Sequence, residues 1–155
     1  MRRTAGFVAI GMALLAVGLA SAQRKKSTLL PSSEAKKVAD QCSRPGPPEF
    51  SDTWQPTGAD IELMESRLPR IKELRAKGCC MEGEQIEDPE HFYMQYVGIV
   101  VKGKKLIYIN AFADDNPPEV WKKEAYIVCD GGVDWGVLYD PETGKFSDLA
   151  VNGVA

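Results

Sequence analysis

The sequence predicts a small α+β domain in which one kinked helix, or two short helices, packs on an antiparallel sheet of four or five strands. Three observations lead to this fold class. Apolar residues recur every three or four positions between residues 57 and 78, as in a helix that buries one face. After residue 90 the pattern changes to short runs rich in Val, Ile and Tyr, which are typical of strands. Turn sequences containing Gly or Pro separate these runs.

The first 22 residues have the pattern of a secretory signal peptide. Arg2 and Arg3 precede an apolar run, and small residues at 20–22 end it. This run is shorter than the ~20 residues that a membrane-spanning helix needs. We therefore expect cleavage after Ala22 and an exported protein, periplasmic or secreted, that is not an integral membrane protein.

Residues 23–53 are predicted to form a basic, proline-rich leader or linker that is extended and loosely held. Residues 23–50 contain six basic and three acidic side chains, which gives a local charge of +3. Prolines at 45, 47 and 48 favour extended backbone. One short helix is expected at 33–41, and the single α+β domain at 54–155.

The main helical segment is predicted to begin at Thr57, whose side chain can cap the helix together with Asp60. Gly78 suits the C-terminal cap. Pro69 should kink the helix or divide it in two, because its ring removes a hydrogen bond and crowds the preceding turn. The predicted buried face consists of Ile61, Met64, Leu68, Ile71 and Leu74.

Five strands are predicted in the second half of the chain, at 91–101, 105–113, 125–130, 135–140 and 145–152. The first two should form an antiparallel hairpin that turns at 102–104. The segment 114–124 is expected to be a loop with one helical turn. The last two strands should be joined by a type I turn that Pro141 favours, with Gly144 at positive φ.

The stretch "CDGGVDWGVLYD" (129–140) is dense in residues that suit either a turn or an ion site. We predict a turn, in which two glycines reverse the chain and Asp130 and Asp134 bond its amides. Calcium sites need more oxygen ligands at fixed spacing, and phosphate loops need glycines before a helix. No metal or cofactor is therefore predicted.

The strand after this turn carries the candidate binding face. Trp135 and Tyr139 should share one face with Val137, while Gly136 and Leu138 lie on the other. If the helix covers the Leu138 side, the two aromatics form an exposed strip that can anchor a partner. If the helix covers the Trp135 side, they belong to the core.

The four cysteines are Cys42, Cys79, Cys80 and Cys129, and export would place them where disulfides persist. Adjacent cysteines rarely bond each other because the ring is strained. We therefore expect Cys79 and Cys80 to pair separately with Cys42 and Cys129, in either order. A zinc site is the alternative, but the spacing lacks the C-x-x-C pair that grips a tetrahedral ion.

Charge and motifs exclude several functions. Residues 51–155 contain eleven basic and nineteen acidic side chains, a local charge of −8, so no nucleic-acid partner is expected. His91 is the only histidine, no G-x-S-x-G motif is present, and full disulfide pairing would leave no nucleophilic thiol. A carboxylate pair for glycoside hydrolysis could come from an acidic loop, although we interpret that loop as solvated surface. Its acids are Glu82, Glu84, Glu87, Asp88 and Glu90.

Four strings in the chain resemble a group of small exported bacterial proteins that have no established activity. They are "TWQPTGADIELMESRL", "YINAF", "VCDGGVDWGVLYD" and "FSDLAVNG". Together they extend from about residue 54 to the C-terminus. The resemblance implies a bacterial, exported, single-domain protein and assigns no catalytic or binding residue.

From these patterns we expect a non-catalytic binding module for a protein or cell-envelope partner. Catalytic motifs are absent, and a disulfide-stapled sheet with aromatic residues is a common recognition platform. The alternative is a small carboxylate-dependent hydrolase that acts on cell-wall polymer. The sequence leaves the partner and the oligomeric state open.

Overall fold

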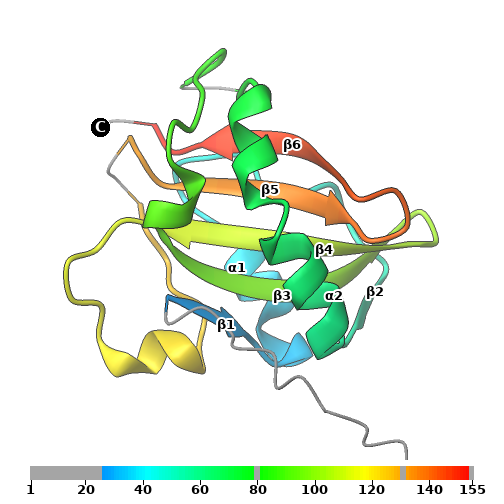
Figure 1. The fold of residues 1–155 in the computed structure, drawn as a ribbon. Coiled ribbons are helices and arrows are strands. Elements are labelled where there is room, and N and C mark those ends of the chain that lie inside the picture. The colour runs from blue at the N-terminus through cyan, green and yellow to red at the C-terminus, as the bar shows by residue number, and fades with distance from the viewer. Residues whose placement is uncertain (1–25, 79–80, 130–131, 154–155) are drawn as a thin grey trace, which may run out of the picture.

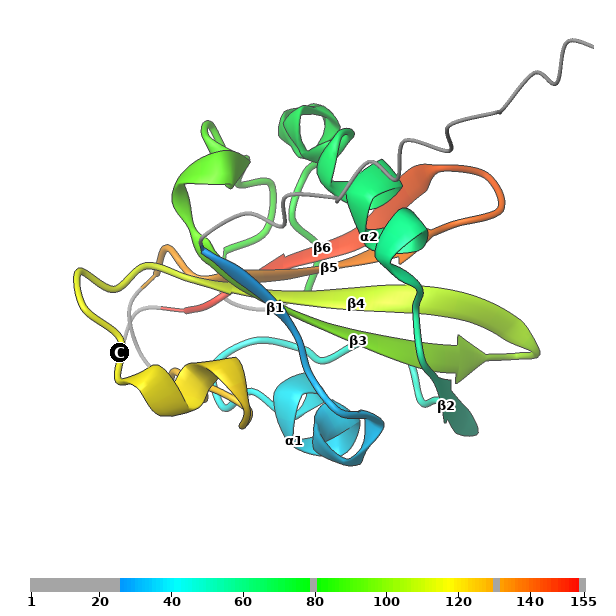
Figure 2. The ribbon, with the colours of Figure 1, turned by 60° about the horizontal axis from the view of Figure 1, so that its bottom comes forward.

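The computed structural model describes residues 26–78, 81–129 and 132–153 of the 155-residue chain. The predicted signal peptide, Cys79, Cys80 and Asp130 lie outside the described residues. The fold is α+β, as predicted, with a mixed sheet of six strands and short helices on both of its faces (Figure 1, Figure 2).

The elements of the described residues are short apart from the central strands. The strands are β1 (Ser27–Leu29), β2 (Asp52–Trp54), β3 (Tyr93–Val101), β4 (Lys104–Phe112), β5 (Trp135–Asp140) and β6 (Lys145–Val151). The α-helices are α1 (Ala35–Ala39) and α2 (Gly58–Glu65). The 3₁₀ helices are η1 (Ser32–Glu34), η2 (Leu68–Glu73), η3 (Pro89–His91) and η4 (Glu119–Lys122).

The centre of the sheet is the predicted hairpin of β3 and β4, which pair over their whole length from Tyr93↔Phe112 to Val101↔Lys104. Lys102 and Gly103 form the turn with φ of 49° and 79°. Two positive φ values match the twist of the flanking strands, as in a type I′ turn. β5 and β6 extend the sheet antiparallel from β4, also as predicted.

Two three-residue strands share the outer edge of β3 and raise the strand number above the predicted four or five. β1 pairs with β3 in parallel along Met94–Tyr96, and β2 pairs antiparallel along Gly98–Val100. The sheet is therefore mixed rather than purely antiparallel.

The predicted helix is divided at Pro69, so the two-helix alternative is confirmed. α2 begins with a capping box between Thr57 and Asp60, as predicted, and ends at Glu65. Pro69 then lies at the start of η2, where a backbone N–H would have no partner within the helix, so its absence costs no hydrogen bond. Because η2 ends at Glu73, Gly78 does not cap it, although its φ of 95° is positive.

The face of the sheet that α2 and η2 cover contains the larger of the two core clusters. Ile61, Met64, Leu68 and Ile71 point into it from the helices. Trp135, Val137 and Tyr139 meet them from β5, and all three are fully buried. The predicted alternation of β5 is therefore confirmed, with the Trp135 side beneath the helices.

The opposite face is covered by residues that the sequence assigned to a loosely held leader (Figure 2). Leu30, Ala35 and Val38 pack on Val97 and other side chains of the sheet to form the second core cluster. Residues 27–54 thus contribute β1, α1 and β2 to the fold. The expected helix at 33–41 is present, split into η1 and α1.

The predicted strand at 125–130 is wrong for its described part, since residues 125–129 form no strand. β5 pairs directly with β4, so the sheet leaves no place for another strand between them. Buried amide side chains replace the ladder. The Gln95 side chain accepts the N–H of Tyr126, and the Asn110 side chain donates to its carbonyl. The Gln41 side chain accepts the N–H of Val128.

Cys42 and Cys129 are bonded to each other, with their Cα atoms 4.9 Å apart. The predicted pairing of each with Cys79 or Cys80 is therefore wrong. The neighbouring Gln41 contacts the backbone of Tyr126 and Val128, which brings Cys42 beside the end of this segment. Both bonded cysteines are exposed to solvent.

Replacing Trp135 with alanine should lower the free energy of unfolding by about 3 to 5 kcal/mol, because a fully buried indole leaves a cavity. Urea denaturation measures the change. Leu63→Ala is the control, since Leu63 is 43% exposed and should lose far less. A loss below about 1 kcal/mol for Trp135→Ala would contradict the burial of this side chain.

The double substitution Cys42→Ser and Cys129→Ser should destabilise the protein by about 4 kcal/mol, because the bond closes a loop with a sequence separation of 87. A non-reducing peptide map should also contain one fragment that joins these two cysteines. Fragments joining either of them to Cys79 or Cys80 would contradict the observed pairing.

Candidate functional site

The structure does not support the candidate binding face on β5. Trp135 and Tyr139 are each 0% exposed, and α2 and η2 cover them. The Tyr139 ring lies 4.9 Å from that of Phe146, and its hydroxyl accepts a 3.4 Å hydrogen bond from Arg67. Both aromatics are core residues, because the helices pack on their side of the strand.

Asp134 connects strand ends and is 3% exposed. Its Oδ1 accepts the N–H of Ala113 at 2.7 Å, and its carbonyl accepts that of Asn152 at 2.8 Å. It thus bonds amides at the ends of β4 and β6 rather than in its own turn. Burial raises the pKa of Asp134, while the bond from Ala113 and the charge of Arg44 oppose the rise.

Within residues 26–78, 81–129 and 132–153, no three His, Cys, Asp or Glu side chains come together as metal ligands.

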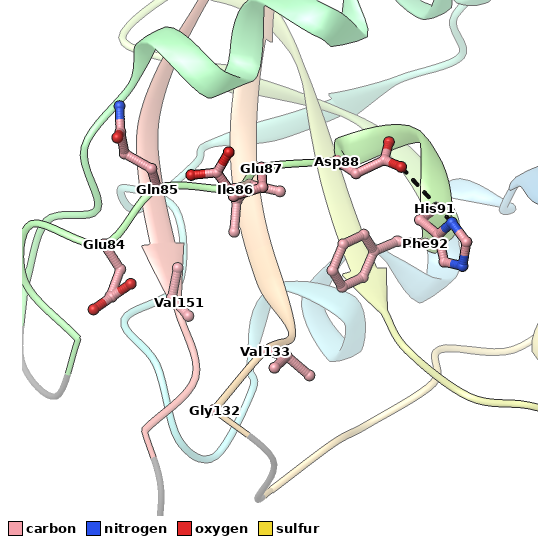
Figure 3. Close-up of a pocket in the computed structure, with 10 residues that line it drawn as sticks. All are labelled: Glu84, Gln85, Ile86, Glu87, Asp88, His91, Phe92, Gly132, Val133 and Val151. Atoms are coloured by element: carbon pink, nitrogen blue, oxygen red, sulfur yellow. Dashed lines mark ion pairs between the residues drawn. The ribbon is translucent and has the colours of Figure 1, made fainter.

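A cavity of about 370 Å³ lies between the acidic loop and the ends of β5 and β6 (Figure 3). Residues 84–88, 91 and 92 form one side, and Gly132, Val133 and Val151 form the other. The loop is held in place by backbone bonds, among them Ala76 N–H to Glu84 O at 2.8 Å. We define this hollow as the loop cavity.

Apolar side chains face the middle of the loop cavity. Ile86 and Val151 are buried, Phe92 is half-buried, and Val133 is 54% exposed (Figure 3). Beneath them the Phe92 ring makes an edge-on contact with Trp135, with centroids 5.6 Å apart. The Trp135 indole N–H has no hydrogen-bond partner among the described residues. The cavity therefore rests directly on the larger core cluster.

Polar residues form the rim of the loop cavity. Glu84, Glu87, Asp88 and His91 are all exposed. Nδ1 of His91 lies 3.8 Å from Oδ2 of Asp88, and their side chains are 81% and 67% exposed. Glu82 and Glu90, which the sequence grouped with these acids, do not line the cavity.

This arrangement is better suited to binding than to acid–base chemistry. A glycosidase needs one carboxyl group whose pKa is raised by an apolar environment. The rim carboxylates of the loop cavity are exposed to solvent and do not lie in such an environment. The apolar wall offers surface that a partner can bury.

In two other hollows, lining side chains already have partners within the protein. Near the β3–β4 turn, Lys105 lies over the Trp54 ring at 5.4 Å, and Asp60 belongs to the helix cap. Beside η3, the Asp114 carboxylate accepts the Tyr126 hydroxyl at 2.6 Å. This bond raises the pKa of Tyr126 to about 12 and lowers that of Asp114.

Sequence reasoning identified the acids of the rim but not the apolar wall. Ile86 interrupts a run of acidic residues, Phe92 follows its end, and Val133 stands alone between a glycine and an aspartate. An apolar side chain inside an acidic loop is the signal that could have indicated a cavity.

Comparison of the chain with models of protein families, with curated proteins and with solved structures finds no match in any of the three. No helix among the described residues is long and apolar enough to cross a membrane. The disulfide is typical of proteins that mature in an oxidising compartment.

The substitution Asp134→Asn should raise stability at pH 7. The folded-state pKa of Asp134 lies above its ordinary 3.8, so the folded state binds this proton more tightly than the unfolded state does. The buried carboxylate therefore costs nothing well below pH 3.8 and destabilises the fold as pH rises through the folded pKa. Asparagine keeps an acceptor for Ala113 and carries no charge.

Urea denaturation of both proteins between pH 3 and 7 checks this expectation. The difference between them should shrink as the pH falls, and excess calcium should leave the wild-type melting temperature unchanged. A variant less stable than the wild type at pH 7 would show instead that the fold uses the Asp134 charge.

Proposed function

We propose that this chain is an exported, non-catalytic binding module that holds a protein or cell-envelope partner in the loop cavity. The observation that carries the proposal is an open cavity with an apolar wall, in which Val133 is 54% exposed. Concave sites with a mostly apolar lining and a few polar groups are typical of binding sites.

Two further features support this function. The walls of the cavity belong to a β-sheet with a packed core and to a loop anchored on it, so the surface is pre-formed and binding orders little of the chain. Export follows from the predicted signal peptide at 1–22, and the disulfide is consistent with it.

A carboxylate-dependent hydrolase remains the second candidate, because three carboxylates border the same cavity. Their exposure favours the binding function, since none of them lies in the apolar environment that a hydrolase provides for its acid. A hydrolase would need the ionisable carboxyl group of Glu87, whereas a binding module does not need it for any reaction.

A photo-crosslinking amino acid in place of Val133 should capture a partner from an envelope extract of the source organism. The same amino acid in place of Leu63 is the matched control, since Leu63 is also exposed, at 43%, but lies on α2 outside the cavity. We expect one discrete product from position 133 and none from position 63.

Equal crosslinking from both positions, or none from either, would contradict the proposed site. Release of soluble sugars or peptides from cell wall by the wild type, abolished in Glu87→Gln, would support the hydrolase instead.

A further inference from the structure

We propose that the loop cavity binds an extended, basic peptide segment of its partner. One apolar side chain of the peptide enters the cavity, and a cationic side chain on either side of it contacts the acids at each end of the loop. This inference rests on the proposed binding function and names the chemistry of the partner.

The size of the cavity limits what can enter. A volume of about 370 Å³ lies near the lower end of the range for ligand pockets. It accommodates one large apolar side chain with its neighbouring backbone rather than a folded surface. Ile86, Phe92 and Val133 supply apolar contacts from two sides of this space (Figure 3).

The charges around the cavity select the sign of the ligand. Glu84, Glu87 and Asp88 line it, and none of its lining residues in the described part of the chain is lysine or arginine. Lys26 donates to the carbonyl of His91, but it lines the neighbouring hollow instead. The carboxylates therefore attract cationic groups and repel anionic polymers or lipid headgroups.

The spacing of the acids favours a peptide over a small amine. Glu84 lies at one end of the loop, and Asp88 lies at the other beside His91, with Ile86 between them (Figure 3). Two cationic side chains that flank an apolar residue match this arrangement, because the acids lie on opposite sides of Ile86 (Figure 3).

The sheet edge next to the cavity is a poor site for a partner to bind by adding a strand. Asp148 in β6 has a φ of 52°, and the β5–β6 register shifts between Gly136 and Leu138. Such a bulge disrupts the regular edge that an added strand would need. Side-chain contacts in the cavity therefore carry the recognition.

The test uses a fluorescein-labelled nonapeptide of glycine and serine with a central leucine and a lysine two positions to each side. Fluorescence anisotropy measures its binding to the processed protein at low salt. We expect saturable binding that weakens as salt increases, because the rim charges are exposed. A peptide with serine for leucine and one with glutamate for lysine should both bind much more weakly.

Substitutions in the protein give the second part of the test. The double variant Glu84→Gln, Asp88→Asn should lower the affinity about tenfold, since two surface ion pairs together contribute about this factor. The matched control is Asp52→Asn, Glu142→Gln, which removes two exposed acids at the opposite end of the sheet. Its affinity should equal that of the wild type, and melting curves should show that both double variants are folded.

Several outcomes would overturn the inference. If the serine peptide binds as tightly as the leucine peptide, the cavity does not recognise an apolar side chain. If the glutamate peptide binds more tightly than the lysine peptide, the site does not select cationic ligands. Binding to phosphatidylglycerol vesicles in place of the peptides would assign the surface to a membrane. If no peptide binds while the crosslinker at position 133 captures a partner, the peptide inference fails and the proposed function stands.

Discussion

The central strands bury side chains on both faces, and this requirement determines how the rest of the chain is arranged. On β5, Trp135 and Tyr139 lie in one core cluster, while Leu138 lies in the other. If only one face of the sheet were covered, the apolar side chains on its other face would be exposed to solvent. The helices α2 and η2 cover the first face, and the N-terminal residues with the segment 121–129 cover the second (Figure 2).

The second face is closed by polar bonds as much as by apolar packing. Arg44 is 5% exposed, and its guanidinium donates to the side chains of Asn110 and Asn152. Asn110 also donates to the carbonyl of Tyr126, so a buried network links the leader to the irregular segment. Satisfied bonds each contribute about 1 to 3 kcal/mol, more where the donor is charged, and losing one partner leaves a buried polar group whose desolvation is costly.

Gly136 allows this network to lie close to the sheet. A Cβ atom at this position would overlap the Tyr108 hydroxyl and approach Nε of Arg44 to 3.0 Å. Nε has no hydrogen-bond partner among the described residues, and it lies beside the space that a Cβ atom would fill. Gly136, which shares its face of β5 with Leu138, therefore makes room for a charged side chain.

Local patterns predicted the elements that local interactions determine. The Thr57 cap, the division at Pro69 and the hairpin turn at Gly103 each depend on residues close in sequence. β1 and β2 were missed because three-residue strands have no measurable periodicity and pair with distant parts of the chain. Residues 125–129 have strand-like composition, but side-chain amides far away in sequence satisfy their backbone.

The site was predicted in part for the same reason. The acids of the loop were visible as a run of charge, but their apolar neighbours acquire meaning only when β5 and β6 bring Val133 and Val151 opposite them. The candidate face at Trp135 failed because the sequence cannot tell which side of a strand the helix will cover. Disulfide connectivity was equally out of reach, since it depends on how Gln41 docks beside Val128.

The central claim is that the chain meets its partner at the loop cavity. An amide chemical-shift titration of the isotope-labelled protein with the leucine-centred basic peptide tests it most directly. We expect the shift changes to be confined to residues 84–88, 91–92, 132–133 and 151, which line the cavity. Changes centred on the β3–β4 turn and residues 141–142 at the other end of the sheet would contradict the account.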